Sequence, residues 1–368
     1  MKRKLSAIAV AAALACGVAS SASASESTVD QTGNDNMANV SQSTFPGGSG
    51  GVANVTQNGN VNTATVTQTV IYMNPVASVS STGNNNAATI LQDNTYLGSA
   101  SISQNGSGNT GTVNQVPGEG GYANSAVATI SQTGSGHTGT INQQGTNAGG
   151  VTGDGASATI IQSANSNSAE INQTNRSRRT TATVEQHGGN ESAVVNQTGD
   201  DHSATVLSVA SSGFDTAAVN QTGSMQTASI RQHAGFSSAT ITQQGSANNA
   251  TVNQDWVRYN SATTWQNGTG NSATVQQGVG CCGTIFEHLT ANVSQTGSSN
   301  VGNVTQTGFY NDALISQTGA GHIATIQQSG TGVLANTNAA AITQTGTGHR
   351  GTINQAGGAG NSATLTQN

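Results

Sequence analysis

The chain has 368 residues, of which only 7% are charged and 3% aromatic, whereas 48 are Gly. A globular enzyme of this length needs a thick apolar core, which this composition cannot build. Low charge together with abundant Gln, Asn, Thr and Val instead favours long stacked sheets with amide ladders.

The first 24 residues have the pattern of a secretory signal peptide. Residues 2–4 are basic, residues 5–18 are apolar, and Ala22-Ser23-Ala24 supplies small residues at a cleavage position. We expect cleavage before Ser25, which makes residues 1–24 a signal peptide and residues 25–368 a single repeat domain.

Removal of this segment leaves six arginines, no lysine and fifteen acidic residues, so the mature chain carries a net charge of about −9. The low charge density and the lack of a basic patch argue against nucleic acid as a partner. Arg176, Arg178 and Arg179 form one basic cluster. We interpret this cluster as a solvated loop rather than a polyanion site.

One short motif recurs through the rest of the chain. Residues 266–277 read Gln-Asn-Gly-Thr-Gly-Asn-Ser-Ala-Thr-Val-Gln-Gln. The first half predicts a turn, because Gly and Asn tolerate positive φ and tight reversals. The second half alternates, so that Ala273, Val275 and Gln277 face one side of a strand and Thr274 faces the other. One copy is therefore one strand and one turn.

We anchor each copy on its last inward residue, which defines 28 units. The anchor is Gln in all but Ser81 and Ser208. Two positions earlier the residue is Val, Ile or Leu in all but Thr264, and four positions earlier it is Ala or Gly in all but Ser27. The anchors are residues 31, 42, 57, 68, 81, 92, 104, 115, 132, 143, 162, 173, 186, 197, 208, 221, 232, 243, 254, 266, 277, 295, 306, 317, 328, 344, 355 and 367. Such regularity indicates a repeated, buried environment.

Each unit is too short to be stable alone, so identical faces must stack. If successive strands alternate between two facing sheets, two units form one rung, and rungs stack about 4.8 Å apart. We therefore predict an all-β solenoid of about 14 two-stranded rungs, with two facing, parallel, in-register sheets. A small residue on one sheet leaves room for a branched residue on the other, and each inward Gln bonds to the Gln of the next rung.

The candidate site is thus structural and lies inside the solenoid. The predicted Gln ladder contains Gln104, Gln115, Gln132, Gln143, Gln221, Gln232, Gln243, Gln254, Gln266, Gln277, Gln295, Gln306, Gln317, Gln328, Gln344 and Gln355. The predicted inward apolar residues beside it are Val113, Ile130, Ile141, Val252, Val275, Val293, Val304, Ile326 and Ile353.

The spacing of the anchors adds a prediction about the turns. Of the 27 intervals, 16 span 11 residues and 11 are longer. The longer intervals follow even-numbered units up to residue 186 and odd-numbered units after residue 208. In a two-stranded rung these two kinds of turn lie on opposite edges. We therefore predict that the inserts change edges, with loops 116–125 and 278–290 on opposite sides.

The motif at 266–277, and its variant at 104–115 with Gly in place of Ala, resemble the curlin repeat. Curlins are the secreted subunits of curli, the functional amyloid fibres of Gram-negative bacteria. The resemblance covers residues 27–368 and implies an extracellular, cell-surface fibre that polymerises with itself and supports adhesion to host or matrix surfaces and biofilm formation. It also implies a nucleator subunit and outer-membrane secretion machinery as partners. The chain differs in having many more units and in starting its repeats directly after the signal peptide.

No set of nucleophile, base and orienting group stands out, so we expect neither an enzyme, a cofactor nor a metal site. Four histidines lie five residues after an anchor Gln, where other copies have Asn: His137, His202, His322 and His349. We interpret them as turn residues, since a metal-binding ladder would require adjacent turns. Adjacent cysteines such as Cys281 and Cys282 rarely form a disulfide with each other, because its geometry is strained. An intermolecular disulfide and two free thiols therefore both remain open.

Three other functions are alternatives. A monomeric extracellular adhesin would use the same solenoid without polymerising. An ice-binding protein would need ranks of Thr-x-Thr on a flat outer face, and only Thr65/Thr67, Thr240/Thr242 and Thr364/Thr366 fit among the units. A β-helical polysaccharide-active enzyme would need acids and bases clustered on one face, which the low charge count disfavours.

Overall fold

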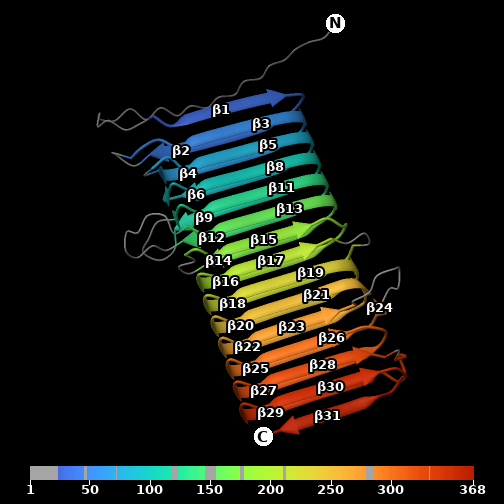
Figure 1. Cartoon of the computed structure of the whole chain (residues 1–368). Coiled ribbons are helices and arrows are strands. Elements are labelled where there is room, and N and C mark those ends of the chain that lie inside the picture. The colour runs from blue at the N-terminus through green and yellow to red at the C-terminus, as the bar shows by residue number, and fades with distance from the viewer. Residues whose placement is uncertain are drawn as a thin grey trace.

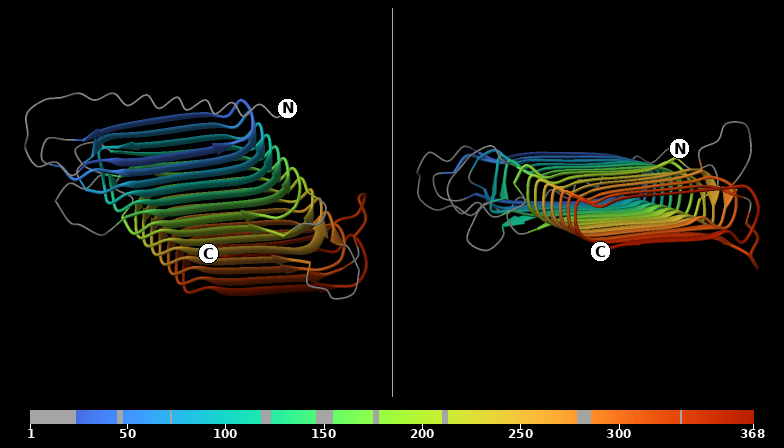
Figure 2. Two further views of the ribbon diagram at one scale, coloured as in Figure 1. Left: turned by 90° about the horizontal axis from the view of Figure 1, so that it is seen from above. Right: turned by 60° about the horizontal axis from the view of Figure 1, so that its bottom comes forward.

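The computed structural model describes residues 24–44, 48–71, 73–117, 123–145, 155–174, 178–209, 213–278, 286–330 and 332–368. Within these ranges the chain consists of strands and turns and contains no helix. The strands wind into a solenoid with two facing sheets (Figure 1). Figure 2 shows that the cross-section is flattened, with one sheet lying over the other. Residues 1–23 of the expected signal peptide and the two adjacent cysteines lie outside the described residues.

The first sheet runs the length of the solenoid and all its strands are parallel. In order it contains β1 (Glu26–Thr32), β3 (Val52–Asn60), β5 (Val76–Asn84), β8 (Ser99–Ser107), β11 (Val127–Ser135), β13 (Ser157–Asn165), β15 (Thr181–Gln186), β17 (Ser203–Ser208), β19 (Thr227–Gly235), β21 (Asn249–Arg258), β23 (Ser272–Gln277), β26 (Val301–Gln306), β28 (Ile323–Ser329) and β30 (Arg350–Ala356).

The second sheet faces the first and is also parallel. In order it contains β2 (Met37–Thr44), β4 (Thr63–Ile71), β6 (Ala87–Asp93), β9 (Thr110–Pro117), β12 (Thr138–Gly145), β14 (Ser168–Thr174), β16 (Ser192–Asp200), β18 (Thr216–Ser224), β20 (Ser238–Ser246), β22 (Ser261–Thr269), β25 (Thr290–Ser298), β27 (Asn311–Ala320), β29 (Asn338–Thr347) and β31 (Ser362–Gln367). Three short strands lie in the turns: β7 (Thr95–Tyr96) pairs with β10 (Ala123–Asn124), and β24 (Phe286–Glu287) pairs with β21.

The predicted solenoid is confirmed. Each of the 28 units forms one strand, and the units alternate between the two sheets, which makes fourteen rungs in the described chain. The register also follows the anchors, because Gln132 on β11 pairs with Gln104 on β8 and with Gln162 on β13.

Small and branched residues alternate across the core, as the repeat predicts. A Cβ added to Gly111 on β9 would lie 2.8 Å from Cγ2 of Ile102 on β8, in the facing sheet. A Cβ added to Gly302 on β26 would lie 2.8 Å from Cγ1 of Val293 on β25. The small residue thus makes room for the branched residue that faces it, and both sheets approach closely along the whole core.

The turns form two edges, and the long inserts change from one to the other. We call the turns that leave the first sheet the first edge, and the turns that leave the second sheet the second edge. The flanking strands β9 and β11 place the described ends of loop 116–125 on the second edge, whereas β23 and β25 place the described ends of loop 278–290 on the first. The order of the flanking strands therefore confirms the predicted change of edge.

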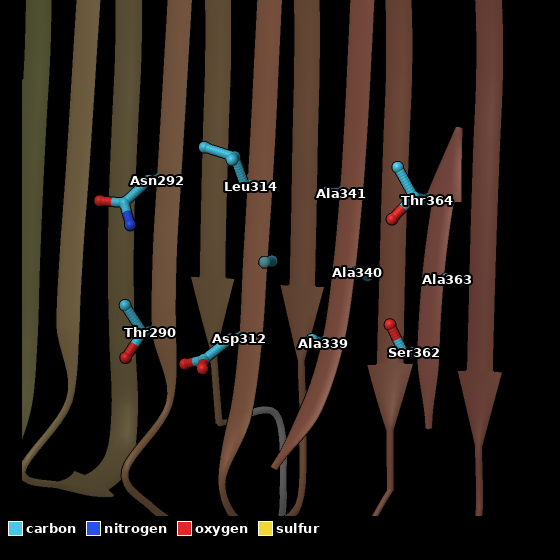
Figure 3. Close-up of a pocket in the computed structure, with 11 residues that line it drawn as sticks. Thr290, Asn292, Asp312, Leu314, Ala339, Ala340, Ala341, Ser362, Ala363 and Thr364 are labelled. Atoms are coloured by element: carbon cyan, nitrogen blue, oxygen red, sulfur yellow. The ribbon is translucent and has the colours of Figure 1, made fainter. Parts of the chain in front are cut away.

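The outer faces carry the alternate side chains. Near the C-terminal end of the second sheet, Leu314 on β27 lies between Asn292 on β25 and small Ala341 on β29, in a shallow depression of the outer face (Figure 3). The Thr-x-Thr pairs of the ice-binding alternative lie on β4, β20 and β31, which are not neighbours in the sheet. No helix long and apolar enough to cross a membrane occurs in the described ranges.

Candidate functional site

The inward glutamines of the second sheet form an unbroken chain of side-chain hydrogen bonds. Each Nε2 donates to Oε1 of the next rung toward the C-terminus, at distances such as 2.9 Å from Gln115 to Gln143. The series runs from Gln42 on β2 to Gln367 on β31. Nε2 also donates to backbone, as Gln115 does to the carbonyl of Ser99 at 3.1 Å. Pairing avoids the cost of about 1–3 kcal/mol for each buried, unsatisfied amide.

The ladder of the first sheet has the same direction but is interrupted at the two serine anchors. Ser81 donates to Oε1 of Gln104 at 3.1 Å, so its hydroxyl partly replaces the amide. The bonds then continue through Gln186, and they resume from Gln232 to Gln355 beyond Ser208. Ser208 is therefore a break in the middle of the solenoid.

The structure brings the sixteen glutamines of the predicted ladder into these two ladders. Gln104, Gln132, Gln232, Gln254, Gln277, Gln306, Gln328 and Gln355 lie on the first sheet, and Gln115, Gln143, Gln221, Gln243, Gln266, Gln295, Gln317 and Gln344 on the second. All are at most 2% exposed except Gln355, which is 9% exposed near the C-terminal end. The nine predicted inward apolar residues are buried in the core: Val113, Ile130, Ile141, Val252, Val275, Val293, Val304, Ile326 and Ile353.

A second column of hydrogen bonds follows the turns. It is formed by residues that lie six positions before an anchor, just ahead of the strand. We call this the cap position. At Asn62, Nδ2 donates to the carbonyl of Gly83 at 2.8 Å, and the backbone N–H donates to Oδ1 of Asn36 at 3.0 Å. A cap Asn such as Asn62 therefore links its turn to the turns on both sides.

Histidine replaces Asn at several caps, as the sequence predicts. In His137, Nε2 lies 3.2 Å from the carbonyl of Thr133, and Nδ1 accepts the backbone N–H of Asn167 at 3.3 Å. His202 has the same pair of contacts with Thr198 and Gln226. Because Nδ1 accepts, the ring is neutral with its proton on Nε2, and it mimics the amide of Asn. Burial lowers the pKa of both His137 and His202, although hydrogen bonds to backbone oppose this shift.

His322 and His349 are the histidine caps that lie on neighbouring turns. Their rings stack with centroids 5.2 Å apart. The nitrogens of His322 are both engaged, since Nε2 contacts the carbonyl of Thr318 at 3.1 Å and Nδ1 accepts the N–H of His349 at 3.3 Å. Among the described residues, no group of three or more His, Cys, Asp or Glu is placed to hold a metal ion.

Two buried carboxyl groups surround the break at Ser208, which the sequence did not reveal. Glu191 and Asp215 occupy successive caps of the first edge, and each is 1% exposed. The hydroxyl of Ser208 lies 2.6 Å from Oε1 of Glu191 and 3.5 Å from Oδ2 of Asp215. Oδ1 of Asp215 accepts the backbone N–H of Ser237 at 2.9 Å. Burial raises the pKa of Asp215 from 3.8 to about 6, and the hydrogen bonds that its carboxyl group accepts from Ser237 and Ser208 only partly oppose that rise.

We expect Asp215→Asn to stabilise the fold at neutral pH, because it restores the amide found at other caps. A carboxyl whose pKa is higher when folded stabilises the fold fully below pH 3.8 and loses that contribution as the pH rises through about 6. The variant should therefore gain up to about 3 kcal/mol in free energy of unfolding above pH 7, at 1.4 kcal/mol per pKa unit. Near pH 3.5 it should match the wild type.

Denaturant unfolding of unassembled chain across this pH range measures the gain. Asp201→Asn is the control: Asp201 pairs with Arg179 on the surface, where that pairing lowers its pKa. This variant should give no gain at neutral pH. A gain for Asp215→Asn that is equal at pH 3.5 and pH 7.5 would contradict the assignment of its effect to the buried charge.

The two ends of the solenoid present open strands. Among the described residues, β1 and β2 pair only with β3 and β4, and β30 and β31 pair only with β28 and β29. Gln31 and Gln42 donate their amides inward, so within the described chain their Oε1 atoms receive no ladder donor. At the other end, Nε2 of Gln367 donates to the carbonyl of Arg350, and within the described residues it makes no ladder bond to another Gln. The N-terminal end thus offers acceptors and the C-terminal end offers donors.

These features define a class: a parallel, two-sheet β-solenoid with directional amide ladders, whose first and last described strands each have one open edge. The family model for the curlin associated repeat matches residues 180–207 and 298–330. These two stretches of the chain are therefore similar to the curlin associated repeat, which supports the resemblance seen in the sequence. The comparison with curated proteins found no match.

Proposed function

We propose that this protein is a secreted structural subunit of curli-like amyloid fibres, rather than an enzyme. Its main partner would be another copy of itself, and the fibre would support adhesion and biofilm matrix at the surface of a Gram-negative bacterium. The observation that carries the proposal is the pair of open ends, which extend the same two sheets with complementary ladder groups. The solenoid and the curlin repeats are consistent with this role.

Stacking the last rung of one copy on the first rung of the next would continue both sheets. In this arrangement β30 meets the next copy's β1, and β31 meets its β2. Gln355 would donate to Gln31, and Gln367 to Gln42, in the direction of every bond within the chain. Exposed strand edges with unpaired N–H and C=O groups template such addition. Polymerisation would therefore be head-to-tail, with a single polarity.

Secretion is also part of the proposal. Residues 1–24 would direct export and be removed, residues 25–368 would form the fibre subunit, and outer-membrane secretion machinery and a nucleator subunit would be partners. A monomeric extracellular solenoid that acts as an adhesin is the alternative. The alternative differs in one property, because its ends would remain unpaired in solution.

Incubation of the purified mature chain, residues 25–368, separates these two possibilities. We expect thioflavin T fluorescence to rise with a lag that preformed fibres shorten, and electron microscopy to show unbranched fibres. Fibre diffraction should give a reflection at about 4.8 Å along the fibre axis, from the stacked rungs. A monodisperse monomer that persists at high concentration for days would contradict the proposal and favour the adhesin.

A further inference from the structure

A stack of aromatic rings runs along the first edge in the C-terminal half of the solenoid. Its members, from five successive rungs, are Phe214, Phe236, Tyr259, His288 and Tyr310, which we call the aromatic strip. Successive ring centroids are 5.1, 5.2, 5.4 and 4.8 Å apart, and the planes differ by 12–24°. The ring separation follows the spacing of the rungs, so the strip lies parallel to the solenoid axis.

The backbone of the strip is in a conformation that bulky residues seldom adopt. The five residues have φ between 52° and 65°. On the N-terminal half of the same edge, the equivalent turn positions hold no aromatic residue and, apart from Val61, only small or polar residues, which tolerate positive φ better: Asp35, Asn85, Gly108, Gly136, Ser166 and Asn190. Five consecutive rungs thus carry a large ring where a small or polar residue fits with less strain. Stacking between the rings offsets part of this strain, but it does not account for the surface that they expose.

The strip leaves much of its apolar surface in contact with solvent. Phe214, Phe236 and Tyr259 are 52%, 44% and 50% exposed. Trp256, beside the strip, is 48% exposed and packs edgewise against His233 at 4.5 Å. Aromatic residues are only 3% of the chain, so this concentration on one edge is not expected from composition. Contiguous exposed apolar surface of this kind is typical of an interaction site.

We propose that the aromatic strip is a lateral contact between fibres, in which the strip of one assembled fibre binds the same strip of another. This inference rests on the proposed polymerisation. An aromatic side chain has roughly 150–250 Å² to bury. The four half-exposed rings, which are Phe214, Phe236, Tyr259 and the adjacent Trp256, therefore offer roughly 400 Å² per chain. A stable pair of free proteins buries about 800 Å² per partner. Two unassembled chains would therefore not remain together through this surface alone.

A fibre changes that balance, because it repeats the strip once in every subunit on a rigid axis. Many weak contacts made together give strong association without any new contact. The ring faces point along the axis and are covered by their neighbours, which leaves the ring edges exposed. A ligand that stacks flat on an aromatic face, such as a sugar ring, finds few free faces, whereas the ring edges of a second strip can pack against these exposed edges. Another fibre is thus the occupant that fits the geometry.

The test compares fibres of the wild type with those of Phe214→Asn/Phe236→Asn/Tyr259→Asn. Asn occupies the equivalent position at Asn85 and Asn190, with φ of 55° and 58°, so the turns can keep their conformation. The matched control is Met225→Asn/Ala247→Asn on the second edge, where both residues also have positive φ and Met225 is 57% exposed. Electron microscopy and low-speed sedimentation of preformed fibres measure the bundled fraction.

We expect all three proteins to form fibres at similar rates, with bundles in the wild type and the control and isolated filaments in the triple variant. Asn190→Phe, which adds a ring at the start of the strip, should increase bundling, and it tests the inference even if the triple variant folds poorly. Bundling of the triple variant equal to that of the wild type would overturn the inference and leave polymerisation intact. If the wild type forms no fibres, polymerisation itself fails, and the lateral contact fails with it.

Discussion

Replacing Gln295 and Gln317 together by lysine is expected to prevent assembly and to unfold the rungs around them. Their amides are at most 1% exposed and lie 2.8 Å apart in the ladder of the second sheet. Two ammonium groups in this place would lose their hydration, repel each other and leave neighbouring amides unpaired. Each unpaired buried charge costs about 3–5 kcal/mol. The loss is large compared with the stability of a typical domain.

The control for this variant adds the same charges to the same two strands. Asn292 and Leu314 are exposed, pair with each other in register and point away from the core. Asn292→Lys/Leu314→Lys should therefore fold and polymerise nearly as the wild type does. Thioflavin T kinetics and far-ultraviolet circular dichroism measure both variants. Unchanged kinetics in Gln295→Lys/Gln317→Lys would rule out a structural role for the inward ladder.

Two glycines of one turn should respond very differently to the same substitution. Gly319 has φ of 128°, and a Cβ there would lie 1.9 Å from the carbonyl oxygen of Gly346 on the next rung. Gly321 has φ of 68°, and a Cβ there would meet no atom within 4 Å. We expect Gly319→Ala to cost on the order of 3 kcal/mol, since both the backbone conformation and the contact between turns are lost. Gly321→Ala should cost about 1 kcal/mol, from the left-handed conformation alone.

Hydrogen exchange is suited to this comparison because a solenoid can open locally without unfolding as a whole. The amide of Gly321, which donates to the carbonyl of Ser298 at 2.9 Å, reports on the turn. Its protection should fall strongly in Gly319→Ala. In Gly321→Ala, the amide at position 321 should remain largely protected. Equal loss of protection in the two variants would contradict the steric explanation.

The fold could be predicted from the sequence because every unit repeats the same inward pattern. Anchors such as Gln132 and Gln162 fix the register, since a shift by one residue would move the whole inward face to solvent. The parity of the long intervals then placed the inserts on the correct edges. Even a substitution such as His137 for Asn could be assigned to its turn, because its distance from the preceding anchor is unchanged.

The features that were missed lie in turns whose length varies, because the inserts change the number of residues between one anchor and the next. Members of the aromatic strip lie at irregular distances after the preceding anchor, so counting forward hides them. Counted backward they share one position, seven residues before the next anchor, as Phe214 does before Gln221 and Tyr310 before Gln317. Glu191 and Asp215 likewise share the position six residues before an anchor. Alignment on the following strand would have revealed both groups, but not the burial of the carboxyls around Ser208.

If copies join head-to-tail through the ladder groups at their ends, two complementary variants should each fail to assemble alone and should assemble together. One carries Gln355→Lys/Gln367→Lys at the C-terminal rung, and the other Gln31→Glu/Gln42→Glu at the N-terminal rung. In each variant a charge would face an uncharged amide of the next copy, so each alone should stay unassembled. A mixture should polymerise, because lysine meets glutamate at one junction and wild-type ends meet at the other.

Thioflavin T fluorescence and electron microscopy of the separate and mixed variants provide the measurement. We expect no fibres from either variant alone and fibres of alternating subunits from the equimolar mixture. Fibres from either variant alone, or a mixture that stays monomeric while the wild type polymerises, would contradict head-to-tail stacking through these rungs.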